Sequence, residues 1–142
     1  MNVFDTLMLP NGSTIKNRIA KAAMEENMAD ADQAPSKDLL RLYQARADGG
    51  AGLIITGNVM DDGRAMTGPG GVVLQDDQQL HKFKHWARTG RSGGAQFWLQ
   101  INHPGRQTPR HVCTEPVGPS AIPLALKGDH YLPPRALTEA EI

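Results

Sequence analysis

Several features that mark other protein classes are scarce or missing in this sequence of 142 residues. A single cysteine, Cys113, excludes an intramolecular disulfide framework and a zinc site built from several cysteines. The 15 basic and 15 acidic residues cancel, so no overall positive charge attracts nucleic acid. The longest uncharged, mainly apolar run, residues 51–60, is half as long as a membrane span requires. We therefore expect one soluble, cytoplasmic domain without a secretory signal and without a nucleic-acid or membrane partner.

Glycine and proline, by contrast, are abundant, with 15 and 10 residues respectively. Most of the prolines lie between residues 104 and 137, where no clear periodicity survives. We expect regular structure to disappear over this stretch. A loop of that length in a compact domain is usually functional, as a lid or a wall of an active site. In a βα-barrel, such an excursion after a strand lies at the catalytic face.

The first third of the chain predicts a hairpin, a strand and a helix. Residues 6–9 and 14–15 flank the turn sequence Pro-Asn-Gly-Ser, which favours a short β-hairpin. Residues 17–24 form a strand candidate, although their composition suits a helix equally well. Ser36 is a good N-cap, and the apolar spacing that follows predicts a helix over residues 37–48.

The same pattern is then repeated. Residues 51–57 are a continuous apolar run bounded by glycines, which is typical of a strand buried on both faces. Asp76 or Asp77 can cap a helix that continues to about Thr89, and residues 95–101 form the next strand. The two helix-to-strand connections have the same sequence pattern, Gly-Gly-Ala followed by the strand, in GGAGLIIT and GGAQFWLQ. Alternating strands and helices predict parallel pairing and an α/β fold, either a barrel or a doubly wound sheet.

The last residues predict a helix start. Thr138 and Glu141 have the spacing of a capping box, yet the sequence stops within the first turn. We expect from this, and from the small number of βα repeats, that the 142 residues are a piece of a longer protein.

Familiar nucleotide and metal motifs are not found. The sequence has no complete GxGxxG fingerprint and no GxxxxGK[ST] phosphate loop. His81 and His85 stand four residues apart on the second helix, but without a HExxH pattern a solvated helix face is the better interpretation. Cys113 is better interpreted as a silent thiol than as a nucleophile, because no base is visible beside it.

Two strand ends favour binding of a flat ligand. Residues 22–24, Ala-Ala-Met, are small where a strand meets a pocket, although tight packing would explain them as well. Gln100 offers an amide donor and a carbonyl acceptor at the end of a buried strand, which suits a ring with adjacent N–H and C=O groups. His103 and Arg106 follow it, and we favour a role in bracing the loop over ligand contact.

Five segments together resemble the old yellow enzyme family, in that family's order and spacing: KNRIAKAAM, GLIITG, QINHPGR, GPSAIP and PRALTEAEI. The resemblance implies the first three βα units of a TIM barrel, with an N-terminal hairpin closing its bottom and a long loop after the third strand. It implies a single FMN-binding domain over residues 1–142, of which residues 104–137 face the active site. It also implies an FMN-dependent NAD(P)H:flavin oxidoreductase that reduces activated alkenes or enones.

The resemblance assigns roles to particular positions. Ala22, Ala23 and Met24 would line the flavin, and Glu25 occupies the position where relatives place a neutral residue that tunes its potential. Gly57 would lie near the isoalloxazine ring, and Gln100 would hydrogen-bond its pyrimidine edge. The groups that hold the phosphate and polarise the substrate lie in later units of the family barrel, so the catalytic residues are expected beyond residue 142.

Two other interpretations stay open. The chain by itself could be catalytically silent, needing further units or a second copy to cover its strand edges. A small flavodoxin-like protein is the third possibility. It would need a phosphate-binding loop after the first strand, and the Glu-Glu-Asn at residues 25–27 is a poor anion site.

Overall fold

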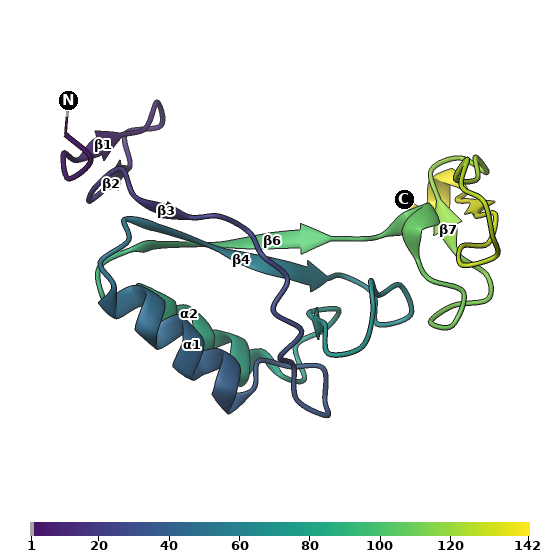
Figure 1. The fold of residues 1–142 in the computed structure, drawn as a ribbon, viewed down its shortest axis with the longest axis horizontal. Coiled ribbons are helices and arrows are strands. Elements are labelled where there is room, and N and C mark those ends of the chain that lie inside the picture. Colours follow the sequence, from purple (N-terminus) through teal and green to yellow (C-terminus); the bar gives the residue numbers. More distant parts are fainter. Residues whose placement is uncertain (1) are drawn as a thin grey trace.

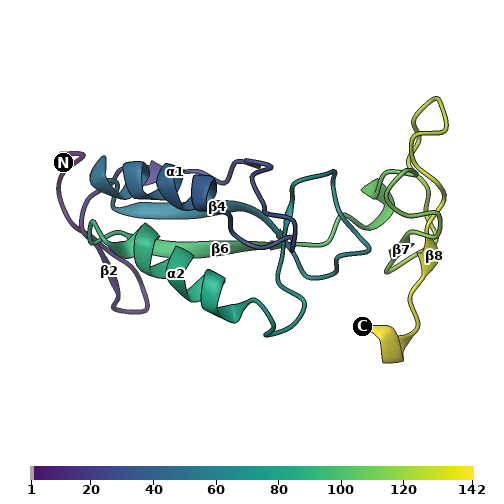
Figure 2. The ribbon, with the colours of Figure 1, turned by 90° about the horizontal axis from the view of Figure 1, so that it is seen from below.

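A parallel sheet forms the centre of the protein in the computed structural model, which describes residues 2–142. Strand β4 lies in the middle and pairs along its whole length with β6, while β3 and β5 pair with the beginning and the end of its other edge. Two helices, α1 and α2, lie side by side on one face of this sheet (Figures 1 and 2). These elements are β3 (Ala20–Lys21), α1 (Lys37–Asp48), β4 (Leu53–Met60), β5 (Val72–Val73), α2 (Leu80–Arg91) and β6 (Gln96–Asn102).

Helix α1 has the bounds that its sequence predicts. The hydroxyl of Ser36 accepts a hydrogen bond from the Leu39 amide at 3.1 Å, which satisfies one of the free N–H groups of the first turn. The helix ends at a Gly-Gly pair whose second member, Gly50, has a φ of 84°. Glycine adopts this left-handed conformation without a steric penalty, so the chain can reverse directly into β4.

Helix α2 begins later than expected, and the predicted cap is wrong. The N-cap is Gln79, which makes no side-chain capping bond. Asp76 instead accepts a hydrogen bond from the Gln78 amide at 2.9 Å, so its carboxylate organises a turn ahead of the helix. An aspartate before an apolar periodic stretch fits a turn and a cap equally well, and only the three-dimensional path of the chain separates them.

The strands differ in length from their predicted ranges. The first, expected over residues 17–24, pairs only at Ala20–Lys21, because the following residues leave the ladder. The second is longer than expected and ends at Met60. Strand β5 was not expected, since two valines are too short a run to show a period.

The N-terminal hairpin is confirmed. Strands β1 (Leu7–Met8) and β2 (Thr14–Ile15) pair antiparallel around the Pro-Asn-Gly-Ser turn. The side-chain amide of Gln96 donates to the carbonyl of Thr14 at 3.0 Å, which ties the hairpin to the start of β6. It therefore lies at the end of the sheet where the strands begin (Figure 1).

The main core lies between the sheet and the two helices. Tyr43 of α1 and Trp86 of α2 are almost fully buried, and their rings meet edge to face with centroids 5.0 Å apart. Phe97 of β6 completes the group, at 5.6 Å from Trp86 and 5.8 Å from Tyr43. Edge-to-face contacts of this kind add to the hydrophobic gain of burying three large rings.

The stretch from 104 to 137 is less irregular than its prolines suggested. It contains a 3₁₀ turn, η1 (Gly105–Gln107), and two short parallel strands, β7 (Val117–Gly118) and β8 (Arg135–Ala136). The expectation that regular structure disappears here is thus wrong in part, because pairs of two residues leave no periodic trace in sequence. After β8, the capping box at Thr138 and Glu141 is present and starts a 3₁₀ turn, η2 (Glu139–Glu141).

Within residues 2–142, no helix is both long and apolar enough to cross a membrane.

Candidate functional site: the carboxyl ends of three parallel strands

The segments that sequence analysis singled out meet at one edge of the sheet. Residues 22–25 follow the end of β3, Gly57 lies in the second half of β4, and Gln100 lies two residues before the end of β6. Because the three strands run parallel, all of these positions lie toward the carboxyl end of the sheet, where α/β folds bind ligands.

A β-bulge shapes the middle of this edge. Ile55 pairs with Trp98 and Asn58 with Gln100, so two residues of β4 face one residue of β6. The hydroxyl of Thr56, one of the two β4 residues in the bulge, accepts a hydrogen bond from the backbone amide of Gln100 at 3.0 Å. Bulges often re-aim side chains beside active sites. This one fixes the backbone of Gln100 through a side chain rather than through the ladder.

Gly57, the second bulge residue, is buried under the segment that follows β3. A Cβ atom at this position would lie 2.1 Å from the carbonyl oxygen of Met24 and 2.7 Å from a carboxylate oxygen of Glu26. Only glycine allows the two backbones to approach so closely. Contact of Gly57 with a flavin stays a prediction, while its packing role against Met24 is evident from these distances.

Several of the residues that the family resemblance assigns to the flavin are open to solvent at this edge. Ala22, Met24 and Glu25 are exposed and Ala23 is half-buried. The side chain of Gln100 is also exposed and makes no hydrogen bond to any of residues 2–142. The small side chains at the end of β3 and the side-chain amide of Gln100, on the other side of β4, fit a flat ring with adjacent donor and acceptor groups.

Gln100 points away from the helices. Its neighbours Phe97 and Leu99 pack into the core under α1 and α2, and side chains alternate along a strand. Trp98 and Gln100 therefore share the opposite face, where Trp98 is 44% exposed. Gln100 thus faces the open side of the sheet, whereas Gly57 is buried.

Glu25, in the same segment, is exposed to solvent. Its carboxylate accepts a short hydrogen bond from the hydroxyl of Thr67, in the loop after β4. The contact orients the carboxylate and draws that loop toward the end of β3.

A buried cluster of charges beneath this edge escaped sequence analysis. The carboxylate oxygen Oε1 of Glu26 accepts from Lys21 Nζ at 2.9 Å, from Tyr43 Oη at 3.1 Å and from Arg46 Nη1 at 2.5 Å. The side chains of Lys21 and Glu26 are each 9% exposed. Lys21 and Glu26 lie near the end of β3, whereas Tyr43 and Arg46 lie on α1, and no spacing in the sequence connects the two pairs.

The cluster shifts the ionisation of its members. Burial by itself would raise the pKa of Glu26, but the hydrogen bonds and charges of Arg46 and Lys21 outweigh it and hold this pKa below its usual range. Burial, reinforced by the negative charge of Glu26, raises the pKa of Tyr43 far above that of a free phenol. Glu26 is thus charged and Tyr43 neutral at physiological pH.

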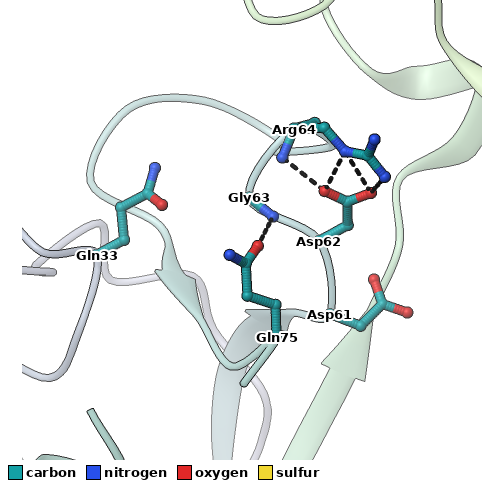
Figure 3. Close-up of a pocket in the computed structure, with 6 residues that line it drawn as sticks. All are labelled: Gln33, Asp61, Asp62, Gly63, Arg64 and Gln75. Carbon is teal, nitrogen blue, oxygen red and sulfur yellow. Dashed lines mark hydrogen bonds and ion pairs between the residues drawn. The ribbon is translucent and has the colours of Figure 1, made fainter. Parts of the chain in front are cut away.

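Two cavities lie near these strand ends, and neither includes the predicted flavin residues. The first, of about 530 Å³, lies at the loop after β4 and is lined by polar side chains. Figure 3 shows the Asp62 carboxylate accepting hydrogen bonds from the guanidinium and the backbone amide of Arg64, and the Gly63 amide bound to Gln75. Asp62, Gly63, Arg64 and Gln75 are thus paired with each other, whereas Gln33 and Asp61 make no hydrogen bond to another residue that lines this cavity.

The second cavity, of about 890 Å³, lies between that loop and the 104–137 excursion. Asp62, His103, Cys113 and Arg135 are among its lining residues. The excursion therefore forms one wall of a cavity next to the carboxyl ends of β4 and β6, and its role as a wall of the active site stays a prediction.

The remaining candidates have contacts typical of structural or surface residues. His81 and His85 are both exposed on α2. The ring of His103 accepts a hydrogen bond from the Gly105 amide at 3.1 Å, and Arg106 donates to the carbonyls of Ile122 and Pro123 at 3.5 Å. These are the loop-bracing contacts that the sequence favoured.

Comparison with known proteins agrees with this geometry. The profile of the NADH:flavin oxidoreductase / NADH oxidase family matches residues 2–142. The NADH-dependent flavin oxidoreductase nadA of Aspergillus parasiticus is 35% identical over 140 residues, which cover 89% of this chain and 32% of that protein. The NADH oxidase of Thermoanaerobacter brockii is 38% identical over 133 residues, which cover 90% of this chain and 20% of that protein.

A solved structure with a similar fold is the old yellow enzyme homologue from Zymomonas mobilis. It matches with a TM-score of 0.82 at 27% identity, over 99% of this chain and 41% of its own length. The chain therefore spans less than half of that structure and a third or less of the two curated relatives. The match of the family profile, the related sequences and the shared fold together show that this chain belongs to the NADH:flavin oxidoreductase / NADH oxidase family.

Proposed function

We propose that the protein is an FMN-dependent oxidoreductase of the ene-reductase type, and that residues 22–25, Gly57 and Gln100 form part of its flavin seat. The observation that carries this proposal is the exposed side-chain amide of Gln100 at the carboxyl edge of the sheet, which has no hydrogen-bond partner among residues 2–142, together with the exposed residues that follow β3. The proposal includes an eight-stranded barrel whose first units would be the parallel strands β3, β4 and β6 with helices α1 and α2.

Bound FMN would supply the redox chemistry, by taking two electrons from NADH or NADPH and passing them as a hydride to an activated C=C bond. The names of the two relatives favour NADH as the reductant. Gln100 would orient the ring by offering both a donor and an acceptor. Ala22, Ala23 and Met24 would give the ring a flat surface, and the packing of Met24 on Gly57 would hold that surface in place.

Glu25 would set the electronic environment of the seat. A carboxylate beside the ring disfavours additional negative charge there, so we propose that it lowers the reduction potential of the flavin. A redox titration of Glu25→Thr should give a higher potential than the wild type. An unchanged potential would remove this role.

The substrate class, the partners and the location are also proposals. The substrate would be a small activated alkene or enone, which the cavity beside the 104–137 excursion could admit. A cytoplasmic location is proposed from the composition, and a homo-oligomer from the exposed Trp98 and Ile101 on β6, the edge strand.

The visible absorption spectrum of the purified protein after addition of FMN and removal of the excess tests the proposal. We expect a retained, perturbed flavin band. Gln100→Ala should weaken FMN binding about tenfold, because about 1.4 kcal/mol of hydrogen bonding is lost. Gln78→Ala, which removes another exposed glutamine side chain, is the matched control and should bind as the wild type does. A folded but colourless protein would contradict FMN binding by this chain and favour the catalytically silent alternative.

A further inference from the structure

The seat segment itself lacks regular backbone pairing. The ladder between β3 and β4 ends at Lys21, and residues 22–25 have no strand partner. A surface that must orient a rigid ring to within about half an ångström needs another source of rigidity.

The bond between Lys21 and Glu26 closes over this segment. The two side chains stand at its two ends, and both are buried, while Ala22, Met24 and Glu25 between them are exposed. The ion pair, with its 2.9 Å separation, therefore acts as a staple across residues 22–25 and forces them outward toward the open edge. The short loop that it closes restricts the conformations available to the seat.

Helix α1 holds the staple from below. Tyr43 and Arg46, one turn apart on α1, both donate to the carboxylate of Glu26. The two side chains also make a cation–π contact with each other, since the Arg46 guanidinium lies 4.8 Å from the centre of the Tyr43 ring. Contact with Tyr43, which is completely buried in the main core, therefore fixes the position of the staple relative to that core.

The staple is also joined to β4 at the bulge. Lys21 Nζ donates to the carbonyl of Ile55 at 2.9 Å, and the hydroxyl of Tyr43 accepts from the Gly57 amide at 3.3 Å. Thr56, between these two residues, binds the amide of Gln100. Lys21 and Tyr43, both partners of Glu26, therefore hold Ile55 and Gly57. The covalent backbone between these two residues carries the constraint to Thr56, and so to the backbone amide of Gln100.

Stability does not explain this arrangement well. Two cations share one carboxylate, so the cluster carries a net positive charge in a largely buried place. Buried ion groups of this kind are often no more stabilising than apolar residues of similar size, because desolvation offsets the attraction. Their benefit is geometric, since a carboxylate that accepts three donors has one allowed position.

We propose that Glu26 is the positioning residue of the flavin seat: it fixes residues 22–25 against β4 and, through the bulge, sets Gln100 in register with them. This inference rests on the proposed FMN function. Glu26 acts through the backbone and does not itself contact the ring.

Two substitutions distinguish the effect of the Glu26 charge from the effect of its side-chain length. Glu26→Asp keeps the charge but is one methylene too short for all three donors, and Glu26→Gln keeps the length but leaves two buried cations without a counter-charge. Asp38→Asn is the matched control, because Asp38 is an exposed carboxylate of α1 in an ion pair with Arg41. Each variant is titrated with FMN, and the visible spectrum is recorded at saturation. Trypsin cleavage after Lys21, measured by mass spectrometry, reports on the staple without any flavin.

Both Glu26 variants should bind FMN at least tenfold more weakly and show a shifted flavin band at saturation. Cleavage after Lys21 should become at least tenfold faster relative to cleavage after the exposed Lys127. A residue important only for stability would lower the melting temperature and leave the band position and the relative cleavage rate unchanged, and that result would overturn the proposal. Wild-type affinity and spectrum in Glu26→Asp would overturn it as well, and this variant decides the matter if Glu26→Gln does not fold.

The proposed function can fail separately. If the wild-type protein binds no FMN while Glu26→Asp still accelerates cleavage after Lys21, the flavin assignment is overturned and the staple across residues 22–25 is supported.

Discussion

The two faces of the sheet differ sharply in what their side chains do. On the face covered by α1 and α2, the rings of Tyr43, Trp86 and Phe97 pack together. Tyr43 and Trp86, the two helix residues, have almost no contact with solvent. On the other face, Trp98 and Gln100 stand in the open. One strand, β6, contributes to both faces in alternate residues. The covered face supplies the free energy of folding, and the open face is left available for binding.

Replacement of the two tryptophans tests this difference most strongly. Trp86→Ala should lower the free energy of unfolding by about 3–5 kcal/mol, because it leaves a large cavity between the helices. Trp98→Ala should cost about 1 kcal/mol or less, since its side chain is 44% exposed. Urea unfolding of both variants measures the two values. Equal losses of unfolding free energy would contradict the conclusion that the covered face supplies most of the stability.

A smaller effect is expected where the covered and open sides meet, at Gly57. Gly57→Ala places a Cβ atom 2.1 Å from the carbonyl of Met24, so the segment after β3 must move. We expect a loss of about 1–3 kcal/mol in stability, together with weaker FMN binding. Gly68→Ala is the control, because its Cβ would meet nothing within 4 Å. If Gly57→Ala melted at the wild-type temperature, the close backbone approach would be in doubt.

The charge cluster below the seat adds a dependence on pH. The folded state holds the pKa of Glu26 below its unfolded value of about 4.5, so ionised Glu26 contributes stability above that pH. This contribution is lost as the pH falls through the lowered pKa. Plots of unfolding free energy against pH should therefore fall less steeply below pH 4.5 in Glu26→Gln than in the wild type. Parallel curves would show that Glu26 is not protonated on acid unfolding.

The smallest expected effect lies within the covered face and compares the two helix starts. Ser36→Ala should cost about 1 kcal/mol, because the Leu39 amide loses its capping partner. Gln79→Ala at the start of α2 should change stability by less than about 0.5 kcal/mol, since Gln79 makes no capping bond. Thermal unfolding of the two variants is sufficient to rank them, and a larger loss at Gln79 would refute the assignment.

Much of the architecture could be predicted because it depends on local signals. The Ser36 cap and the Gly-Gly stop define α1 within the sequence itself, and the two apolar runs after Gly-Gly pairs define β4 and β6. The cap of α2 was misassigned because an aspartate before a helix serves a turn or a cap equally well. Strands β5, β7 and β8 were missed because a strand of two residues is too short to show an alternation of apolar and polar side chains.

The candidate site divides in the same way. Gln100 and residues 22–24 were predicted to bind the flavin from their place at strand ends and from a family resemblance; the family profile confirms the family, and the residue roles stay predictions. Glu26, Tyr43 and Arg46 were missed, because a glutamate after a strand and a tyrosine on a helix are unremarkable until the fold brings them together.

The sequence by itself determined the alternation of strands and helices, the parallel sheet and the family, since periodicity, capping residues and glycine pairs act over a few residues. Only the tertiary structure decided that β4 is bulged at Thr56 and Gly57, that the Met24 carbonyl lies against Gly57, and that one carboxylate joins Lys21 to α1. The reason is physical: close backbone approach and buried ion pairing depend on distances between segments far apart in the chain, which packing alone sets.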